Sequence, residues 1–455
     1  MRIRIASVAA LCAMLLGPSS FSAQEAPGQF VLTASGWGAA QDAAVAAAGG
    51  AVVFSHDGAG VALATSGAPD FLARVRAASA IRSAEADRLV QWQQPSVTVD
   101  LEADAVAPGD DRYFPGVQWA PQAIDAPAAW AAGCTGAGVR VAIVDGGIYS
   151  AHPDLAANLD VAASRSFVPG QPFDNDTGTF WHGTHVAGIV AAADNTIGIV
   201  GIAPEATIVG VKVLHGGSGS FGAVIQGILY AATPSSQGGG GADIINMSLG
   251  AVFPKNDTGA GQLVAAMNKA VNYANRSGVL VVSAAGNDGL DLDHAYNYVS
   301  VPAESGAGMA VAATGPAGFA LGATDFDRPA TYTNYGTSVI DVAAPGGNDV
   351  LYDPSPTAPV CTRPVVSPAG TVAVPCWVFD LVLSTSRAGY TWAEGTSMAS
   401  PAAAAVAALV KQSHPGISLG GLRAALRNSA VDAGKKGADP LYGKGFVNAL
   451  RACQY

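Results

Sequence analysis

Six short runs of Val, Ile and Ala recur after residue 138 and constrain the fold more than any other feature. They are VRVAIVD (139–145), ATIVGVKVL (206–214), ADIINMSL (242–249), GVLVVSAAG (278–286), MAVAAT (309–314) and VIDVAAP (339–345). Such near-continuous apolar runs are typical of strands that are covered on both faces. Helical patterns begin between or after them near His182, Phe221, Gly261, Ser397 and Ser418. The alternation predicts an α/β fold with a doubly wound parallel sheet, in which ligands bind beyond the carboxyl ends of the strands.

A smaller unit with a different pattern precedes these runs. Between about 28 and 94, stretches typical of strands and helices follow in the order strand, helix, strand, strand, helix, strand. This βαββαβ order predicts a small ferredoxin-like domain. Residues 95–115 are acidic, contain proline and carry few apolar side chains, which predicts an exposed linker. Residues 347–383 interrupt the later alternation with many prolines, which predicts a surface insertion.

The chain begins with the features of a secretory signal peptide. Arg2 and Arg4 precede an apolar run from Ile5 to Gly17, and small residues follow. We therefore expect residues 1–23 to be removed and the protein to be secreted, either to the periplasm or out of the cell. No later apolar run reaches the roughly 18 residues that a membrane-spanning helix needs. The net charge of −11 argues against nucleic acid or an anionic membrane as the main partner.

Four cysteines remain after removal of such a peptide, and in an exported protein they predict two disulfides. Cys361 and Cys376 lie close together in the Pro-rich insertion, so we expect them to pair. Cys134 is then left for Cys453, although four cysteines allow three pairings. A zinc site is the alternative use of these residues, but no Cys-x-x-Cys spacing occurs.

Three side chains suited to catalysis lie where strands end or helices begin. Asp145 ends VRVAIVD, His182 begins the helical stretch HGTHVAGIVAAA, and Ser397 begins an Ala-rich helical stretch. Taken singly, such residues are more often structural, for example as helix N-caps. Taken together, they supply what acyl transfer requires, namely a hydroxyl nucleophile, an imidazole base and a carboxylate that orients the imidazole.

The surroundings of these residues carry a family resemblance. VAIVDGGIYSAHPDL, HGTHVAGIVAA, INMSLG, SAAGND and GTSMASP occur in this order, and over residues 113–452 the chain resembles the subtilisin-like serine proteases. The order Asp, His, Ser is that of subtilisin. The resemblance implies that Ser397 is the nucleophile, that His182 is the general base and then acid, and that Asp145 orients it. It also implies that the Asn287 amide and the Ser397 backbone N–H both donate to the oxyanion. Catalysis is expected to need no cofactor.

The same resemblance implies where a peptide substrate binds. Extended peptides add to exposed strand edges, and the resemblance places two such edges beside the nucleophile. The residues of these edges are Gly217, Ser218, Gly219, Ser248, Leu249 and Gly250. Ala284, Ala285 and Gly286 are expected to form a wall of the main specificity pocket.

The loop ADNTIGIVG after the His182 helix resembles the calcium loop of the family. The oxygen ligands that this resemblance implies come from Asp154, Ala193, Asn195, Ile197 and Ile199. Carboxylate, amide and carbonyl oxygens are the ligands that Ca²⁺ prefers, so a structural calcium ion is expected. His182 and His185 share a helix face, as zinc ligands do, but no carboxylate motif accompanies them. We therefore expect His185 to be a buried helix residue.

The resemblance gives the leading unit a role as well. It implies that residues 24–105 form a propeptide that inhibits the enzyme, and that residues 106–455 form the catalytic domain, with cleavage between about 95 and 112. The protein is then expected to be a monomeric, secreted serine endopeptidase that is made as a zymogen and acts on proteins or peptides. The alternative is a catalytically silent binding protein with this fold. An α/β-hydrolase esterase is disfavoured, because no G-x-S-x-G occurs and its chain order differs.

Three positions depart from the family pattern. Gly146 stands where Ser or Thr is usual, which removes one hydrogen bond to the catalytic carboxylate. Glu394 replaces a neutral polar residue before GTS, and Ala402 replaces a His after SMASP.

The sequence does not show after which substrate residue the enzyme would cut. The acids that follow Asn287 fit either a basic substrate side chain or a solvated acidic loop. These acids are Asp288, Asp291 and Asp293.

Overall fold

The computed structural model describes residues 24–93, 97–102, 111–114, 116–305, 307–366, 370–387 and 389–455. The expected signal peptide and part of the expected cleavage window lie outside these residues. Within the described ranges, no helix is both long enough and apolar enough to span a membrane.

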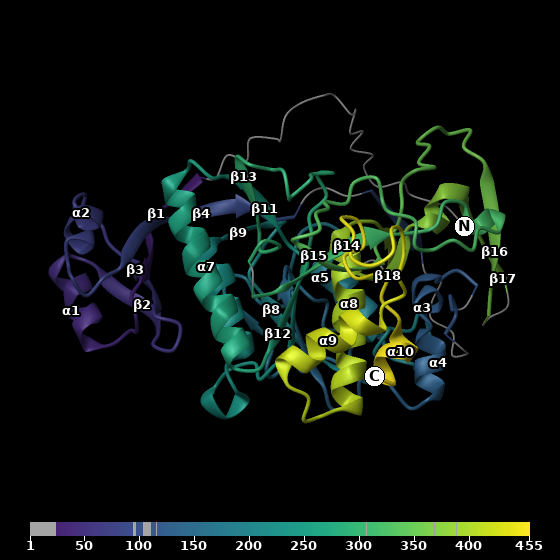
Figure 1. The fold of residues 1–455 in the computed structure, drawn as a ribbon, viewed down its shortest axis with the longest axis horizontal. Helices are drawn as coiled ribbons and strands as arrows, with labels where there is room; N and C mark the ends of the chain where they lie inside the picture. The colour runs from purple at the N-terminus through teal and green to yellow at the C-terminus, as the bar shows by residue number, and fades with distance from the viewer. Residues whose placement is uncertain are drawn as a thin grey trace.

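A seven-stranded parallel sheet forms the centre of the molecule (Figure 1). In spatial order its strands are β15 (Ile340–Pro345), β14 (Met309–Thr314), β12 (Leu280–Ala284), β10 (Ile244–Met247), β6 (Arg140–Asp145), β8 (Thr207–Lys212) and β7 (Arg165–Ser166). All pairings within it are parallel. Six of these strands lie within the predicted apolar runs, so the predicted α/β sheet is confirmed. The sequence pattern missed β7, which has only two residues.

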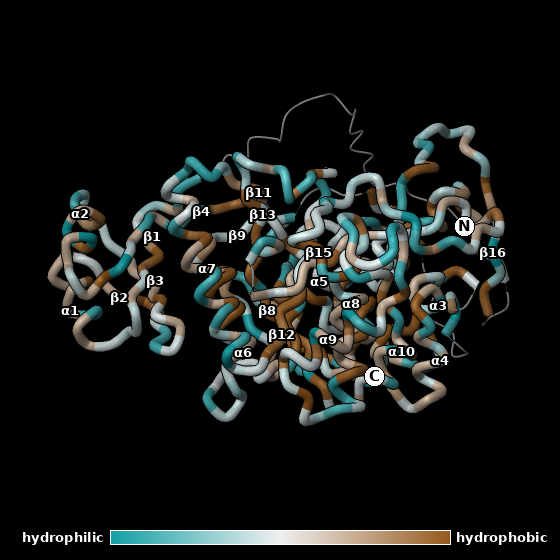
Figure 2. Tube along the Cα trace, in the orientation of Figure 1, coloured by the Kyte–Doolittle hydropathy of each residue, from teal (hydrophilic) through white to brown (hydrophobic). Residues whose placement is uncertain are grey.

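Helices cover both faces of this sheet, as the apolar runs require. The side chains of β6 alternate: Val141 and Ile143 join one core cluster, whereas Ala142 and Val144 join the other. The first cluster packs under α5 (His182–Ala191), α8 (Thr396–Ser413), α9 (Leu419–Ser429) and α10 (Ala449–Cys453). The second packs under α6 (Phe221–Ala232) and α7 (Thr258–Arg276). Figure 2 shows the hydrophobic strands enclosed between the helices.

The leading residues form a separate small unit at one end of the molecule, beside α7 (Figure 1). Its elements are β1 (Gln24–Thr33), α1 (Ala39–Ala47), β2 (Ala51–His56), β3 (Val61–Thr65), α2 (Phe71–Arg76) and β4 (Ser83–Gln91). Leu32, Val45 and Phe71 belong to its own apolar core. Its sheet has the order β2-β3-β1-β4-β9, and the fifth strand, β9 (Ser218–Ser220), comes from the main body of the chain.

The prediction of an exposed linker over residues 95–115 is wrong for the described part of that segment. β5 (Thr98–Glu102) is the third strand of an antiparallel sheet with β19 (Gly389–Ala393) and β18 (Val382–Ser386). Val99 and Leu101 are each only 2% exposed. Their alternation with polar residues is typical of a strand with one buried face, and the acidic composition of the segment obscured it.

The prediction that residues 347–383 form a surface insertion is also wrong in part. The insertion contains a hairpin of β16 (Val360–Val365) and β17 (Gly370–Pro375). The turn that follows, η3 (Cys376–Asp380), is buried, and Val378 and Phe379 belong to the main core. The remaining elements are α3 (Ala120–Ala123), α4 (Ala126–Ala131), η1 (Ser235–Gln237), β11 (Ala251–Pro254), β13 (Tyr298–Val301) and η2 (Phe319–Leu321).

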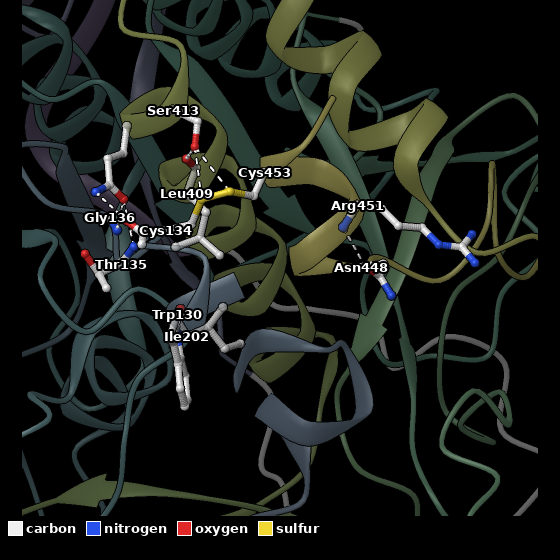
Figure 3. Close-up of a disulfide and its surroundings, with 12 residues drawn as sticks. Trp130, Cys134, Thr135, Gly136, Ile202, Leu409, Ser413, Asn448, Arg451 and Cys453 are labelled. Carbon is white, nitrogen blue, oxygen red and sulfur yellow. Dashed lines mark hydrogen bonds between the residues drawn. A yellow bond between two sulfur atoms is a disulfide. The ribbon is translucent and has the colours of Figure 1, made fainter. Parts of the chain in front are cut away.

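Both predicted disulfides are confirmed. Cys134–Cys453 joins the loop after α4 to α10, and the Ser413 hydroxyl of α8 lies 3.1 Å from the Cys134 sulfur (Figure 3). Cys361–Cys376 closes the β16–β17 hairpin with a sequence separation of 15. The first bridge fixes the chain end to the main body, and the second closes only a local loop.

Replacing both Cys361 and Cys376 by Ser will lower the free energy of unfolding by about 3 kcal/mol, because the bridge restricts a short loop in the unfolded chain. Urea unfolding measures this change, in a Ser397→Ala background that removes the expected nucleophile. The control is Ser355→Ala in the same insertion, where the exposed Ser355 hydroxyl contacts the hydroxyl and the backbone N–H of nearby Thr357. Equal stability of the double-Ser variant and the control would contradict the prediction.

Candidate active site

Asp145 and His182 come together beyond the carboxyl end of β6. Asp145 is the last residue of β6 and is fully buried, and His182 is the first residue of α5. His182 Nδ1 lies 3.0 Å from both carboxylate oxygens of Asp145. The Gly146 backbone N–H donates to Asp145 Oδ1 at 2.6 Å. This geometry suits a carboxylate that fixes the orientation of an imidazole.

Ser397 lies at the N-terminus of α8, where the helix dipole favours negative charge. Its Oγ donates to the Ser248 carbonyl oxygen at 3.3 Å, and the Ser248 hydroxyl donates to the Ser397 carbonyl oxygen at 2.7 Å. Among the hydrogen bonds of the described residues, none joins Ser397 Oγ to His182. Ser248 follows β10, so the expected substrate edge and the expected nucleophile are in direct contact.

Asn287 follows β12 and is held by Thr396, the residue before Ser397. Its Oδ1 accepts hydrogen bonds from the Thr396 backbone N–H at 2.9 Å and from the Thr396 hydroxyl at 2.7 Å. Because a backbone N–H can only donate, this atom must be the amide oxygen, and the amide nitrogen is left to donate elsewhere. The neighbouring Gly286 has a φ of 104° and donates its N–H to the Thr396 hydroxyl at 3.1 Å. Ala284, Ala285 and Gly286 thus lie beside the Ser397 turn.

The two expected substrate edges flank a strand of the leading unit. β4 pairs antiparallel with β9, with Val90 opposite Gly219. Trp92 then donates its backbone N–H to the Gly217 carbonyl oxygen and accepts from the Gly250 N–H, both at 2.9 Å. The end of the leading unit therefore occupies both edges at once, which the sequence alone did not reveal.

Gln93 is a site residue that sequence reasoning missed. Its amide nitrogen lies 2.8 Å from Asp145 Oδ1 and 2.9 Å from His182 Nδ1. No local motif marks it, and its only sequence signal is its position directly after the last strand of the leading unit.

The sequence profile of the Subtilase family matches residues 136–445. The chain is a subtilase. It is 37% identical over 338 residues to subtilisin Savinase of Lederbergia lenta, covering 74% of this chain and 98% of that protein. Thermitase of Thermoactinomyces vulgaris is 36% identical over 351 residues, covering 76% and 99% of the two chains. As a subtilase, the protein is a serine endopeptidase.

Solved structures agree on the fold. A lanthipeptide protease superposes with a TM-score of 0.59 at 28% identity, covering 74% of this subtilase and 95% of that chain. The epidermin leader peptide processing protease of Staphylococcus aureus has a TM-score of 0.71 and covers 94% of this chain and 97% of its own. At 20% identity, that second match shows the fold alone.

Two buried carboxylates of the subtilase lie near the expected calcium loop. Asp154 Oδ1 and Asp111 Oδ1 are buried without a hydrogen-bond partner among the described residues. Asp154 Oδ2 accepts from the Ile199 N–H at 3.0 Å and from the Tyr390 hydroxyl at 3.1 Å. Burial, and to a lesser degree the charge of Asp111, raises the pKa of Asp154 to about 8. Sequence reasoning missed Asp111, because it assigned that residue to the linker.

The other residues of the expected calcium site lie in the loop after α5. The Asn195 side chain accepts from the Ile197 N–H at 3.2 Å, and the Ala193 N–H donates to the Asp154 carbonyl oxygen at 2.8 Å. Within the described ranges, no group of three or more His, Cys, Asp or Glu side chains is placed to hold a metal ion. The Asp194 carboxylate also interacts with Asp111, and a cation here would rely on carbonyl and amide oxygens besides these carboxylates.

His185 and two of the acids after Asn287 have structural partners. His185 is fully buried, as predicted, and its Nε2 lies 2.9 Å from the Thr391 carbonyl oxygen. Asp291 lies 2.8 Å from His294, and Asp293 accepts from the Thr337 N–H at 2.7 Å. Asp291 is thus paired within its own loop, and Asp293 joins that loop to the segment around Thr337.

Glu394 gives the subtilase a pH-dependent stability. It is 7% exposed, and its Oε2 has no hydrogen-bond partner in the described chain. Burial first, and then the charge of Asp349, raises its pKa from 4.5 to about 8. The folded state therefore holds this proton more tightly than the unfolded state, and stability falls as the pH rises from about 4.5 to 8.

Replacing Glu394 by Gln will remove this loss of stability. Above pH 8 the variant will have a higher Tm than the parent chain, and each kcal/mol in the free energy of unfolding raises Tm by about 2–4 °C. The difference in Tm will shrink toward pH 5. Calorimetry at pH 5 and pH 9 in the Ser397→Ala background measures it. A Tm difference that does not change between the two pH values would contradict the prediction.

Proposed function

We propose that this subtilase is secreted as a zymogen and hydrolyses peptide bonds through Asp145, His182 and Ser397. The observation that supports it most is the contact of His182 Nδ1 with buried Asp145 at the same sheet edge as Ser397. With Nδ1–H held by Asp145, the Nε2 atom has a lone pair to take the Ser397 proton as the hydroxyl attacks a carbonyl carbon.

The rest of the mechanism follows from the same groups. The carbonyl oxygen becomes an oxyanion, to which the Asn287 amide and the Ser397 backbone N–H donate. The protonated imidazole then gives its proton to the leaving amine, and an acyl-enzyme forms on Ser397 Oγ. Water, deprotonated by His182, attacks this ester and releases the second product.

The leading unit is proposed to be the inhibitor of this site. Its strand β4 occupies the substrate edge, and the Trp92 ring packs against Phe221 at a centroid distance of 4.9 Å. Arg88 forms a two-pronged ion pair with Asp257, the N-cap of α7, with distances of 2.6 and 3.1 Å. A substrate would have to displace this strand to reach either edge.

Gln93 adds a chemical reason for inhibition. Its amide nitrogen lies 2.9 Å from His182 Nδ1, whose proton faces the Asp145 carboxylate at 3.0 Å, so the Gln93 side chain packs directly against the imidazole. Gln93 also takes an acceptor position on Asp145 that the active imidazole uses. The proposed zymogen is therefore blocked sterically, and Gln93 also competes with His182 for Asp145 Oδ1.

A serine-reactive fluorophosphonate tests the proposed function. The full chain is expected to lose its leading unit and to be labelled at Ser397, whereas Ser397→Ala stays full-length and unlabelled. Mass spectrometry of the new N-terminus locates the cut. A wild-type chain that neither reacts nor sheds the leading unit would support the silent binding protein instead.

We also propose a structural calcium ion at the loop after α5. Asp154 and Asp111 would hold it through their unpartnered oxygens, together with oxygens of Ala193, Asn195, Ile197 and Ile199. A cation would remove the repulsion of two buried carboxylates and tie the segment around Asp111 to the main body.

Replacing Asp111 by Asn will separate the two effects of this site. In EDTA the variant will be at least as stable as the wild type, because a buried carboxylate is gone. In calcium at about 100 times its Kd the wild type will gain about 2.7 kcal/mol and the variant far less. Thermal unfolding of Ser397→Ala chains measures both, with exposed Asp70→Asn as the control. An equal gain for Asp111→Asn and the control would contradict the prediction.

A further inference from the structure

A second buried carboxylate, that of Asp176, lies beside the turn that carries Asp145. Its side chain is 5% exposed. Asp176 Oδ2 accepts from the Gly147 N–H at 3.2 Å, two residues after Asp145. Asp176 Oδ1 accepts from the Gly216 N–H at 2.8 Å, directly before the substrate edge that begins at Gly217. One carboxylate therefore joins the turn of the catalytic Asp to the edge that holds the substrate.

The absence of a side chain at Gly146 belongs to the same arrangement. A Cβ atom placed on Gly146 would lie 2.3 Å from Asp176 Oδ2, far closer than such atoms approach. Asp176 thus occupies the space where most subtilisin-like sequences are expected to carry a Ser or Thr side chain. The departure at Gly146 is matched by the position of Asp176.

Lys212 supplies positive charge to this cluster. It is fully buried, lies at the end of β8 in register with Asp145, and donates from Nζ to the Leu214 carbonyl oxygen at 2.6 Å. Burial lowers its pKa, and the charges of Asp176 and Asp145 oppose that change. His215 Nδ1 is also 3.6 Å from Asp176 Oδ1. Lys212 is therefore a buried positive charge in register with Asp145, and its charge attracts those of Asp145 and Asp176.

We propose that Asp176 is a positioning residue, which holds the Asp145 turn and the Gly217–Gly219 edge in one relative position, with Lys212 as its buried countercharge. This inference rests on the proposed peptidase function and assigns to it a residue that touches neither substrate nor the reacting atoms. A shift of about 1 Å between a catalytic group and its substrate costs on the order of 100-fold in rate.

The variant Asp176→Asn tests the proposal, because it keeps the size but places an amide NH₂ against one of the backbone N–H groups. Two substrates are compared, a peptide long enough to lie along Gly217–Gly219 and a short ester that does not reach this edge. We expect kcat/KM for the long peptide to fall about 100-fold, with a raised KM, and the ester to lose much less. The control is Asp174→Asn, whose carboxylate accepts from the Ser150 hydroxyl at 2.9 Å and touches neither turn.

Rates are normalised to the Ser397 sites that react with fluorophosphonate, so that misfolded molecules do not count. Wild-type protein that is never labelled would refute the peptidase itself and is thereby distinguished from failure of this proposal. If kcat/KM of Asp176→Asn equals that of the control, or falls by the same factor for the long peptide and the short ester, Asp176 does not position the edge. A second variant, Gly146→Ala, is expected to be far more harmful alone than in combination with Asp176→Ala, and purely additive losses would overturn the steric link.

Discussion

Replacing His182 by Ala will lower kcat for peptide hydrolysis by about 10⁶-fold, the size of the loss known for subtilisin itself, a member of this family. Without the imidazole, no group among the described contacts of Ser397 can take its proton, because the Ser397 hydroxyl otherwise meets only the Ser248 carbonyl oxygen. Asp145 does not substitute, because its carboxylate is fully buried behind the imidazole. Self-removal of the leading unit is expected to stop as well.

The measurement needs a processed variant. An affinity-tagged His182→Ala chain is cut in trans by untagged wild-type enzyme, purified by its tag and assayed with a chromogenic peptide. His294→Ala serves as the control, because that side chain is 65% exposed and contacts its loop neighbours Asp291 and Tyr296. A His182→Ala variant within 100-fold of wild type would mean that another base serves Ser397.

Replacing Asn287 by Ala will lower kcat by about 10²- to 10³-fold with little change in KM, as for the oxyanion-hole Asn of subtilisin. The reason is that, in the proposed mechanism, the amide nitrogen donates to an oxygen that is negatively charged only in the transition state. Since the amide oxygen also holds Thr396, the Ala variant loses a structural contact too.

Asn287→Asp separates these two roles. It keeps an oxygen for the Thr396 N–H and hydroxyl but has no amide donor. We expect it to lose at least as much kcat as Asn287→Ala, while exposed Asn428→Ala stays near wild type. Steady-state kinetics on processed enzyme decides, and an Asn287→Asp variant with nearly full kcat would rule out Asn287 as the oxyanion donor.

The sequence could predict those features of the molecule that depend on residues close together in the chain. The buried strands appear as uninterrupted apolar runs because helices cover both faces, and Asp145, His182 and Ser397 stand at the ends of such elements. The disulfides were predictable because few cysteines offer few pairings. In each case the physical cause lies within a few residues of the feature.

The parts that escaped prediction depend on partners far along the chain. Gln93 matters because β4 docks on β9, which brings it to residues 52 and 89 positions away. In the sequence, Asp111 is one of several acids in an expected linker. Only the fold shows that it lies near Asp154 and the loop after α5. β5 was missed because its partner strand, β19, lies almost 300 residues later, and acidic neighbours outweighed the alternation of Val99 and Leu101.

The placement of β5 makes the two sides of that strand unequal as cleavage points. A cut before Thr98 leaves the strand attached to the main body, and the three-stranded sheet with β19 survives. A cut after Glu102 frees β5 to depart with the leading unit. The outer edge of β19 would then present unpaired N–H and C=O groups, and its apolar side chains would be uncovered beside them. An enzyme cut before Thr98 keeps β19 paired on both sides. An enzyme cut after Glu102 has an unpaired edge on β19, which can pair with a strand of another chain.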